Sequence, residues 1–241
     1  MVYIERIPTY IPGFDALIEG GLPEGSLTLL SGTPGSGKSI FCAQMLYNNA
    51  KNGKRCLYLD LEQEIGDIEL QMRMFGWETR ELENLRIFSI DSSNPQIVEK
   101  VIAEIEDRHY DLIVLDSLDS ITTNPGSVEE IQQQFRERVP SISIPNLLDQ
   151  ATLARLKIKK IFSAIKKSKA TALATSERVE GGVGVSRDTV SEFLCDGVVI
   201  FTSTAMGKKR ARSIEISKMR HTNTPGGRYD LEIAGRGLVV L

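Results

Sequence analysis

Apolar residues along this chain form two patterns that alternate with each other. Short runs that are apolar almost throughout predict strands buried on both faces, as in the interior of a parallel sheet. Such runs cover residues 27–31, 55–61, 85–90, 111–116 and 170–176. Between them, apolar residues recur at every third or fourth position, which predicts helices with one buried face. This alternation of strand and helix favours an α/β fold built on a parallel sheet.

The predicted helices lie between these strands. Their positions are about 38–51, from Ile65 to Phe75, from Ile97 to Ile105, and about 146–168. Gly53 ends the first of them. The region 121–150 is less regular, and its apolar spacing predicts one short helix, over 128–139, that Pro140 stops.

The C-terminal part of the chain has a different pattern. After the Gly-rich segment 180–188, four strand patterns follow one another with short turns between them, at 196–202, 212–219, 228–234 and 237–241. Short turns require antiparallel pairing, so these strands are predicted to form an antiparallel edge of the same sheet. The chain has no internal repeat and no low-complexity linker, and residues 1–241 are therefore predicted to form one domain.

Composition narrows the class of protein. The chain has 241 residues, of which 41% are hydrophobic and 25% charged, which fits one large globular domain. Its net charge of −3 argues against a generally basic, nucleic-acid-binding surface. The N-terminus has no long apolar run after a basic start, so we expect no signal peptide, no membrane span and a cytoplasmic location. Three widely spaced cysteines, Cys42, Cys56 and Cys195, favour reduced, buried thiols over disulfides or a zinc site.

The most specific motif is "GTPGSGKS" at residues 32–39, which matches the phosphate-binding pattern G-x-x-x-x-G-K-[ST]. It follows a predicted strand and begins a predicted helix, as the motif requires. Its glycines allow the backbone amides to wrap around phosphates, and Lys38 supplies a positive charge. The residues predicted to bind the nucleotide, ATP, are Thr33, Pro34, Gly35, Ser36, Gly37, Lys38, Ser39 and Ile40.

A phosphate loop works with a magnesium ion, which needs oxygen ligands. Ser39 offers a hydroxyl, and Asp116 ends the strand 111–116, where the carboxyl ends of parallel strands face the ligand crevice. We therefore expect Mg²⁺ to bind together with ATP, with Ser39 and Asp116 as its protein ligands. Beside a phosphate loop, this interpretation of Asp116 is favoured over a simple cap of the following turn.

Hydrolysis also needs a group that orients a water molecule and takes its proton. Asp60, Glu62 and Glu64 follow the second strand, at the same end of the predicted sheet. The residues alone do not choose among these three carboxylates.

Near the C-terminus, "SIEISKMR" at residues 213–220 combines a strand pattern with two cations. Lys218 and Arg220 are two residues apart, so an extended strand places them on one side. The same side is predicted to carry Ile214 and Ile216. Taken alone, such a pair is an ordinary solvated strand end.

Together these motifs resemble the single-domain relatives of the circadian clock ATPase KaiC, within the RecA superfamily. The matching segments are 11–39, 58–68, 75–78, 111–118, 175–177, 190–201 and 213–220, and the resemblance continues to the C-terminus. It implies a RecA-like P-loop core, with a mainly parallel sheet flanked by helices and an antiparallel C-terminal edge. It also implies a homo-oligomeric ring, expected to be a hexamer, with nucleotide between subunits and slow ATP hydrolysis coupled to assembly or to a signalling partner.

The resemblance assigns catalytic roles to individual residues. It places the catalytic glutamate at Glu62, although the family usually has two adjacent glutamates and this chain has Gln63. Lys218 and Arg220 match a Lys-x-Arg pair that reaches the γ-phosphate in the neighbouring subunit. With Lys38 they complete the expected catalytic set.

Two further residues are interpreted more conservatively. Ser176, at the end of its strand, is a candidate sensor of the nucleotide state, with a purely structural hydroxyl as the alternative. His221 does not match the family's pattern, and we interpret it as a turn residue.

Two alternatives stay open. One is a DNA-dependent recombinase or motor-type ATPase, because the loop 177–188 contains Arg178 and Arg187; its acidic residues and its lack of aromatic residues argue against DNA. The second is a nucleotide-gated scaffold with negligible turnover, for which Gln63 is the only hint. The resemblance also implies a capacity for autophosphorylation, for which the sequence indicates no acceptor.

Overall fold

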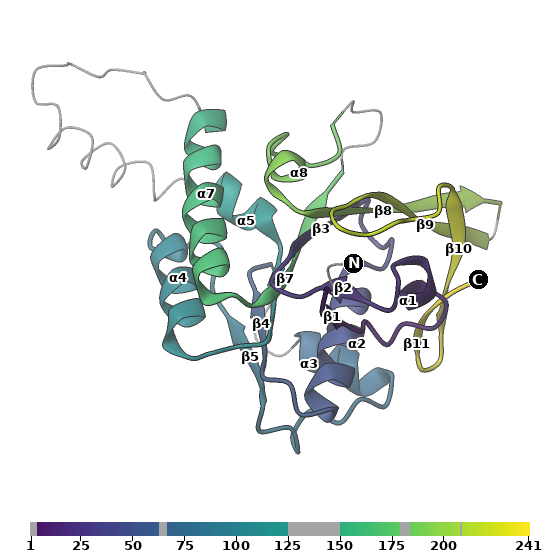
Figure 1. The fold of residues 1–241 in the computed structure, drawn as a ribbon. Coiled ribbons are helices and arrows are strands. Elements are labelled where there is room, and N and C mark those ends of the chain that lie inside the picture. Colours follow the sequence, from purple (N-terminus) through teal and green to yellow (C-terminus); the bar gives the residue numbers. More distant parts are fainter. Residues whose placement is uncertain (1–3, 63–66, 125–149, 179–183, 208) are drawn as a thin grey trace, which may run out of the picture.

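The computed structural model describes residues 4–62, 67–124, 150–178, 184–207 and 209–241 (Figure 1). The short helix predicted over 128–139 lies outside these residues, as do Gln63, Glu64 and Ile65. No helix within the described ranges combines the length and the apolar character needed to cross a membrane.

A sheet of nine strands forms the centre of the described fold. Its strands are β3 (Leu27–Gly32), β4 (Cys56–Asp60), β5 (Leu85–Ser89), β6 (Leu112–Asp116), β7 (Thr171–Glu177), β8 (Gly197–Met206), β9 (Lys209–Met219), β10 (Arg228–Ala234) and β11 (Gly237–Val240). Their order across the sheet is β11-β10-β9-β8-β3-β7-β6-β4-β5. Neighbours from β5 to β8 pair in parallel, whereas β8 to β11 pair antiparallel. The predicted parallel sheet with an antiparallel C-terminal edge is confirmed.

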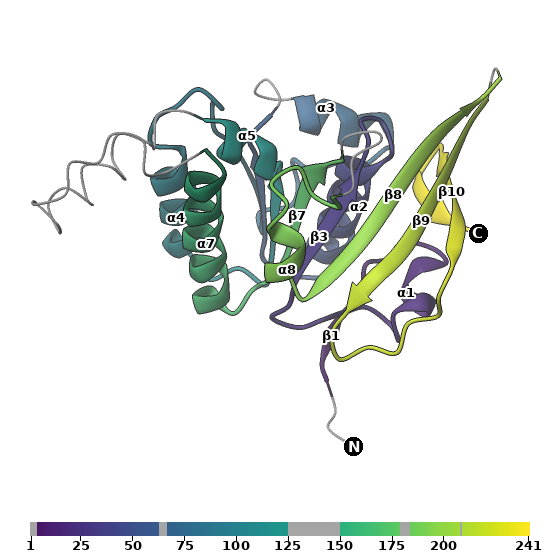
Figure 2. The same ribbon diagram turned by 90° about the horizontal axis from the view of Figure 1, so that it is seen from above.

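Helices cover both faces of this sheet. They are α1 (Phe14–Leu17), α2 (Lys38–Lys51), α3 (Asp67–Met74), α4 (Ile97–Asp107), α5 (Leu118–Thr123), α7 (Gln150–Ser168) and α8 (Ser191–Leu194). The buried residues of α1, α2 and α3 form one hydrophobic cluster, and those of α4, α5 and α7 form another. Alternate residues of the central strands belong to alternate clusters, so the two clusters lie on opposite faces. Figures 1 and 2 show α4, α5 and α7 grouped together. A short ribbon of β1 (Arg6–Ile7) and β2 (Leu22–Pro23) completes the described strands.

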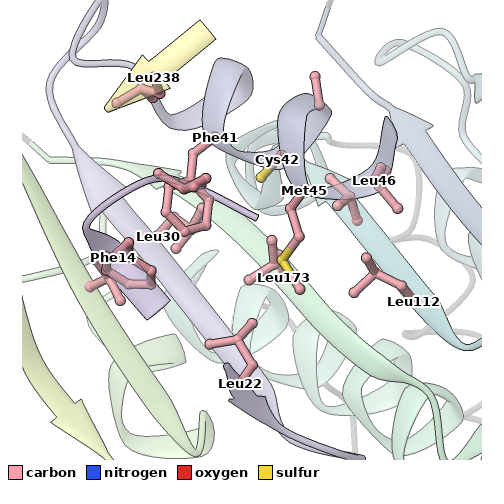
Figure 3. Close-up of a cluster of buried hydrophobic side chains, with 14 of the residues drawn as sticks. Phe14, Leu22, Leu30, Phe41, Cys42, Met45, Leu46, Leu112, Leu173 and Leu238 are labelled. Carbon is pink, nitrogen blue, oxygen red and sulfur yellow. The ribbon is translucent and has the colours of Figure 1, made fainter. Parts of the chain in front are cut away.

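Helix α2 is anchored by aromatic packing (Figure 3). The ring of Phe41 meets Phe14 edge-on at a centroid distance of 5.1 Å and Phe201 at 5.6 Å. All three rings are buried, and each contributes roughly 1.5–3 kcal/mol through burial alone. Because α2 begins at Lys38, this packing also fixes the loop that precedes it.

The cysteines are buried, as predicted. Cys42, Cys56 and Cys195 are free, and burial raises the pKa of each thiol. Neutral, shielded thiols are poor nucleophiles and poor metal ligands, so we assign them to packing. The described residues also contain no cluster of three or more His, Cys, Asp or Glu that could hold a metal on its own.

Candidate functional site

The phosphate loop joins the end of β3 to the start of α2. Gly35 and Gly37 have φ angles of 71° and 112°, which side chains other than glycine rarely tolerate. At Gly32, an added Cβ would lie 2.4 Å from the carbonyl oxygen of Phe201. The glycines of the motif are therefore required by backbone conformation and by close packing against β8.

Lys38 lies inside this loop and is buried. Its Nζ donates to the carbonyl oxygens of Gly32, at 2.8 Å, and of Thr33, at 3.2 Å. Burial lowers the pKa of Lys38, while nearby carboxylates, Asp116 first among them, oppose that shift. The ammonium group therefore stands between the loop and the carboxylates at the ends of the strands.

Two hydroxyl groups of the loop indicate what kind of ligand it can bind. The Oγ1 of Thr33 and the Oγ of Ser36 are shielded from solvent and have no hydrogen-bond partner among the described residues. A buried donor without an acceptor is costly, so such groups point to an acceptor supplied by a ligand. Together with the amides and with Lys38, they fit an anion such as a phosphate chain.

Asp116 is held rigidly at the end of β6. Tyr58 and Thr175, from the two flanking strands, each donate a hydroxyl hydrogen to one of its carboxylate oxygens. Asp116 is only 5% exposed, and its negative charge acts to raise the pKa of Lys38. With the hydroxyl of Ser39, this carboxylate offers the hard oxygen donors that Mg²⁺ prefers.

Glu62 lies just beyond β4. The residue is exposed overall, but its Oε1 accepts a hydrogen bond from the Ser117 hydroxyl, and local burial of the carboxyl group raises its pKa. Asp60 is buried, and it accepts the backbone N–H of Glu62 at 3.3 Å. Glu64 lies outside the described residues. The geometry therefore favours Glu62 over Asp60 as a group that can meet a water molecule.

The sequence reasoning missed one acidic residue of this site, Asp119. It lies in the first turn of α5, is 4% exposed, and accepts the backbone N–H of Glu177 at 2.6 Å and the hydroxyl of Ser176 at 3.3 Å. Burial raises the pKa of Asp119 to about 6. Its backbone N–H donates to the Ser117 hydroxyl oxygen, and Ser117 in turn donates to Glu62. The available signal was an acid three residues after Asp116, at the start of the helix that follows a central strand.

Ser176, the candidate sensor, belongs to the same network. Besides donating to Asp119, its hydroxyl oxygen accepts the backbone N–H of Arg187 at 3.3 Å. The residue is fully buried near the end of β7. Its role as a sensor stays a prediction, and its contacts connect Asp119 with the segment that contains Arg187.

The raised pKa of Asp119 leads to a prediction about how the free energy of unfolding varies with pH. Its pKa rises from an ordinary 3.8 to about 6 on folding, so its favourable contribution is complete below pH 4 and is lost as the pH rises through 6. Asp119→Asn keeps an acceptor for Glu177 and cannot ionise. Relative to the wild type, the free energy of unfolding of this variant should increase between pH 4 and pH 7 by up to about 3 kcal/mol. Urea unfolding at several pH values measures this; a difference that does not vary with pH would contradict it.

Lys218 does not lie on the predicted face of its strand. The pairing of β8 with β9 contains a bulge, because Val198 is opposite Lys218 while Val199 is opposite Ile216. Beyond the bulge Met219, not Lys218, takes the buried side together with Ile216. The expectation that Lys218 shares a face with the isoleucines was therefore wrong, since one extra residue reverses the alternation.

Lys218 and Arg220 are held at the other end of the sheet from the phosphate loop. The Nζ of Lys218 donates to the carbonyl oxygens of Cys195, at 2.5 Å, and of Glu192. Arg220 forms an ion pair with Asp196 at 3.0 Å, and Asp196 accepts the backbone N–H of Leu27, the first residue of β3. Gly32 lies five residues further along β3, or about 17 Å. Within one chain, this pair is therefore separated from Lys38 and Glu62.

His221 lies in the turn that follows, with a φ of 59° and its carbonyl oxygen accepting a hydrogen bond from Arg6. Its interpretation as a turn residue is confirmed. A non-glycine residue in this conformation is typical of tight turns.

Comparison with known proteins agrees with this geometry. A family model described as "ATPase: KaiC" matches residues 7–241. The circadian clock protein KaiC3 of Synechocystis sp. is 32% identical over 99% of this chain and 46% of its own length. The circadian clock oscillator protein KaiC of Synechococcus elongatus is 31% identical over 98% of this chain and 44% of its own. The chain thus spans less than half the length of these relatives.

A solved structure matches the fold from end to end. It is the KaiC-like protein of the hyperthermophilic archaeon Pyrococcus horikoshii OT3, with a TM-score of 0.80 at 26% identity. The match covers 99% of this chain and 100% of that one. The fold is therefore RecA-like, and the chain belongs to the KaiC family of ATPases.

Proposed function

We propose that this chain binds ATP with Mg²⁺ and hydrolyses it slowly at the interfaces between copies of itself in a ring, expected to be a hexamer. The observation that carries the proposal is the separation, within one chain, of the C-terminal cations from the residues beside the phosphate loop. Lys38, Asp116 and Glu62 meet beside the phosphate loop, whereas Arg220 is held at the opposite end of β3. A head-to-tail assembly would bring Arg220 of one subunit to the phosphate loop of the next.

Binding would rest on the phosphate loop. Lys38 is paired with backbone oxygens of its own loop, and a phosphate chain would offer it stronger, charged partners. The residues Thr33 to Ile40 would surround the phosphates, and Ser39 and Asp116 would hold the metal. When bound, Mg²⁺ would neutralise charge on the phosphate oxygens.

Glu62 is proposed as the residue that orients the attacking water and takes its proton. Ser117 holds one carboxylate oxygen and leaves the other for water. Burial raises the pKa of Glu62, which makes its carboxylate a better proton acceptor. Gln63 replaces the second glutamate that the family usually carries, which fits slow turnover.

Lys218 and Arg220 are proposed to act on the nucleotide of the neighbouring subunit. Positive charges placed there would stabilise the charge that builds up on the γ-phosphate during transfer. Both side chains are held by oxygen atoms near α8, so they are fixed before any neighbour arrives. We further propose that hydrolysis is coupled to assembly or to an unidentified signalling partner, and that the protein acts in the cytoplasm.

A DNA-dependent role is less well supported. Arg187, one of the two cations of the loop 177–188, lies 3.8 Å from the carboxylate of Glu177, so its charge is partly neutralised. Binding to a nucleic acid depends on uncompensated positive charge.

Turnover measurements on the purified chain test these functions. We expect phosphate release from ATP that requires Mg²⁺, occurs in assemblies larger than a monomer, and is unchanged by single-stranded DNA. Stimulation by single-stranded DNA would instead favour the motor-type alternative. Tight, Mg²⁺-dependent ATP binding without phosphate release would favour the scaffold, and absence of nucleotide binding would contradict all three.

A further inference from the structure

The ribbon of β8 and β9 continues past the end of the parallel sheet. Strand β3 pairs with β8 only as far as Phe201, opposite Gly32, whereas β8 and β9 stay paired up to Met206 and Lys209. The ribbon therefore extends five residues beyond β3, or about 16 Å. Figure 2 shows it projecting from the rest of the described fold. Because the phosphate loop begins where β3 ends, the ribbon passes directly beside that loop.

Two arginines of β9 meet the loop there. The Nε of Arg212 donates to the carbonyl oxygen of Gly35 at 3.1 Å. The Nη1 of Arg210 lies so close that a Cβ added to Gly35 would be 2.9 Å from it. Alternation along β9 puts both arginines on the same face as Ile214, the face that packs against α2. This face of β9 therefore carries an isoleucine where it packs against helix α2 and arginines where it lies beside the phosphate loop.

Arg212 contacts the peptide between Gly35 and Ser36, whose N–H, from Ser36, donates to the carbonyl oxygen of Thr33 at 3.2 Å. Gly35 is exposed and has a φ of 71°, so its own conformational preferences do little to fix it. Lys38 holds the carbonyls of Gly32 and Thr33 from within the loop, whereas Arg212 holds that of Gly35 from a different element. Fixing a carbonyl also fixes the amide of the same peptide, because the two are coplanar.

We propose that Arg212 is a positioning residue for the phosphate loop, which it holds in the conformation that receives the nucleotide. The inference rests on the proposed nucleotide binding and adds a residue to that site. Ordering the loop in advance lowers the entropic cost of binding. The positive charges of Arg212 and Arg210 also favour an anion at the loop. Within the described residues the side chain of Arg210 forms no ion pair and no hydrogen bond, so no carboxylate among them pairs with its charge.

Arg212→Ala, Arg212→Lys and Arg228→Ala form a matched set of variants. Arg228 is the control, because its Nε also makes a 3.0 Å contact with an acceptor on β9, Glu215, but does not touch the loop. The measurements are the Kd for ATP with Mg²⁺, KM and kcat for its hydrolysis, and the urea midpoint of unfolding without nucleotide.

For Arg212→Ala we expect Kd and KM to rise about tenfold, while kcat falls by no more than about twofold and the urea midpoint stays the same. Arg212→Lys should recover at least half of the lost affinity on a logarithmic scale. Arg228→Ala should bind as the wild type does. Arg212→Ala with wild-type affinity would overturn the inference, as would a loss of affinity matched by a lower urea midpoint. A wild type that binds no nucleotide would instead refute the proposed function, so the two failures are distinguishable.

Discussion

Replacing Glu62 with glutamine is expected to slow ATP hydrolysis by about 10²- to 10⁴-fold, the contribution typical of a general base. Glutamine keeps the size of the side chain and can still accept the hydrogen bond from Ser117. It cannot take a proton from water. The Kd for ATP with Mg²⁺ should therefore change by less than about threefold, because Glu62 acts on the water and not on the phosphate chain. Phosphate release under single-turnover conditions measures the effect.

Glu69→Gln is the matched control, because Glu69 is an exposed glutamate of α3 without a part in the site. That variant should hydrolyse ATP at the wild-type rate. The wild-type rate should also fall as the pH is lowered, because Glu62 then takes up a proton. Since the pKa of Glu62 is raised, this fall should occur at a higher pH than an ordinary glutamate would give. If Glu62→Gln hydrolyses ATP as fast as the wild type, Glu62 has no catalytic role.

Replacing Arg220 with alanine is expected to slow hydrolysis by about 10³-fold or more, the range found when an arginine that stabilises the transferring phosphate is lost. Arg220 lies far from the loop of its own chain, so the Kd for ATP of an isolated chain should not change. Arg108→Ala serves as the control, because Arg108 is an exposed arginine whose ion pair is with the adjacent Asp107. Equal turnover by wild type and Arg220→Ala would contradict the assigned role.

The parallel core was predictable because each of its segments carries one clear physical signal. Strands β3, β4 and β6 are buried along their whole length, and strands covered on both faces are mostly apolar. Helix α2 was predicted with the bounds that the structure shows, because the phosphate motif fixes its start and Gly53 its end. Local signals of this kind depend little on the rest of the fold.

The features that escaped prediction depend on contacts between distant segments. The bulge in β9 arises from its pairing with β8, and the segment "SIEISKMR" does not by itself indicate an extra residue. Asp119 became part of the site only because α5 turns back toward β7, which brings its carboxylate to Glu177. The contact of Arg212 with Gly35 spans 177 positions of sequence. Burial and pairing at such separations are properties of the folded chain.

Mixing two inactive variants tests whether each site is shared between two subunits. Lys38→Ala removes the cation of the loop, and Arg220→Ala removes the group offered to the neighbour. In a head-to-tail ring formed from equal amounts, about a quarter of the interfaces would combine an intact loop with an intact arginine.

Mixed assemblies carrying a different affinity tag on each variant can be isolated by two purification steps, so that subunit exchange is verified before turnover is measured. We expect each variant alone to be inactive and the mixed assemblies to recover about a quarter of the wild-type rate of phosphate release. No recovery of activity in verified mixed assemblies would contradict it.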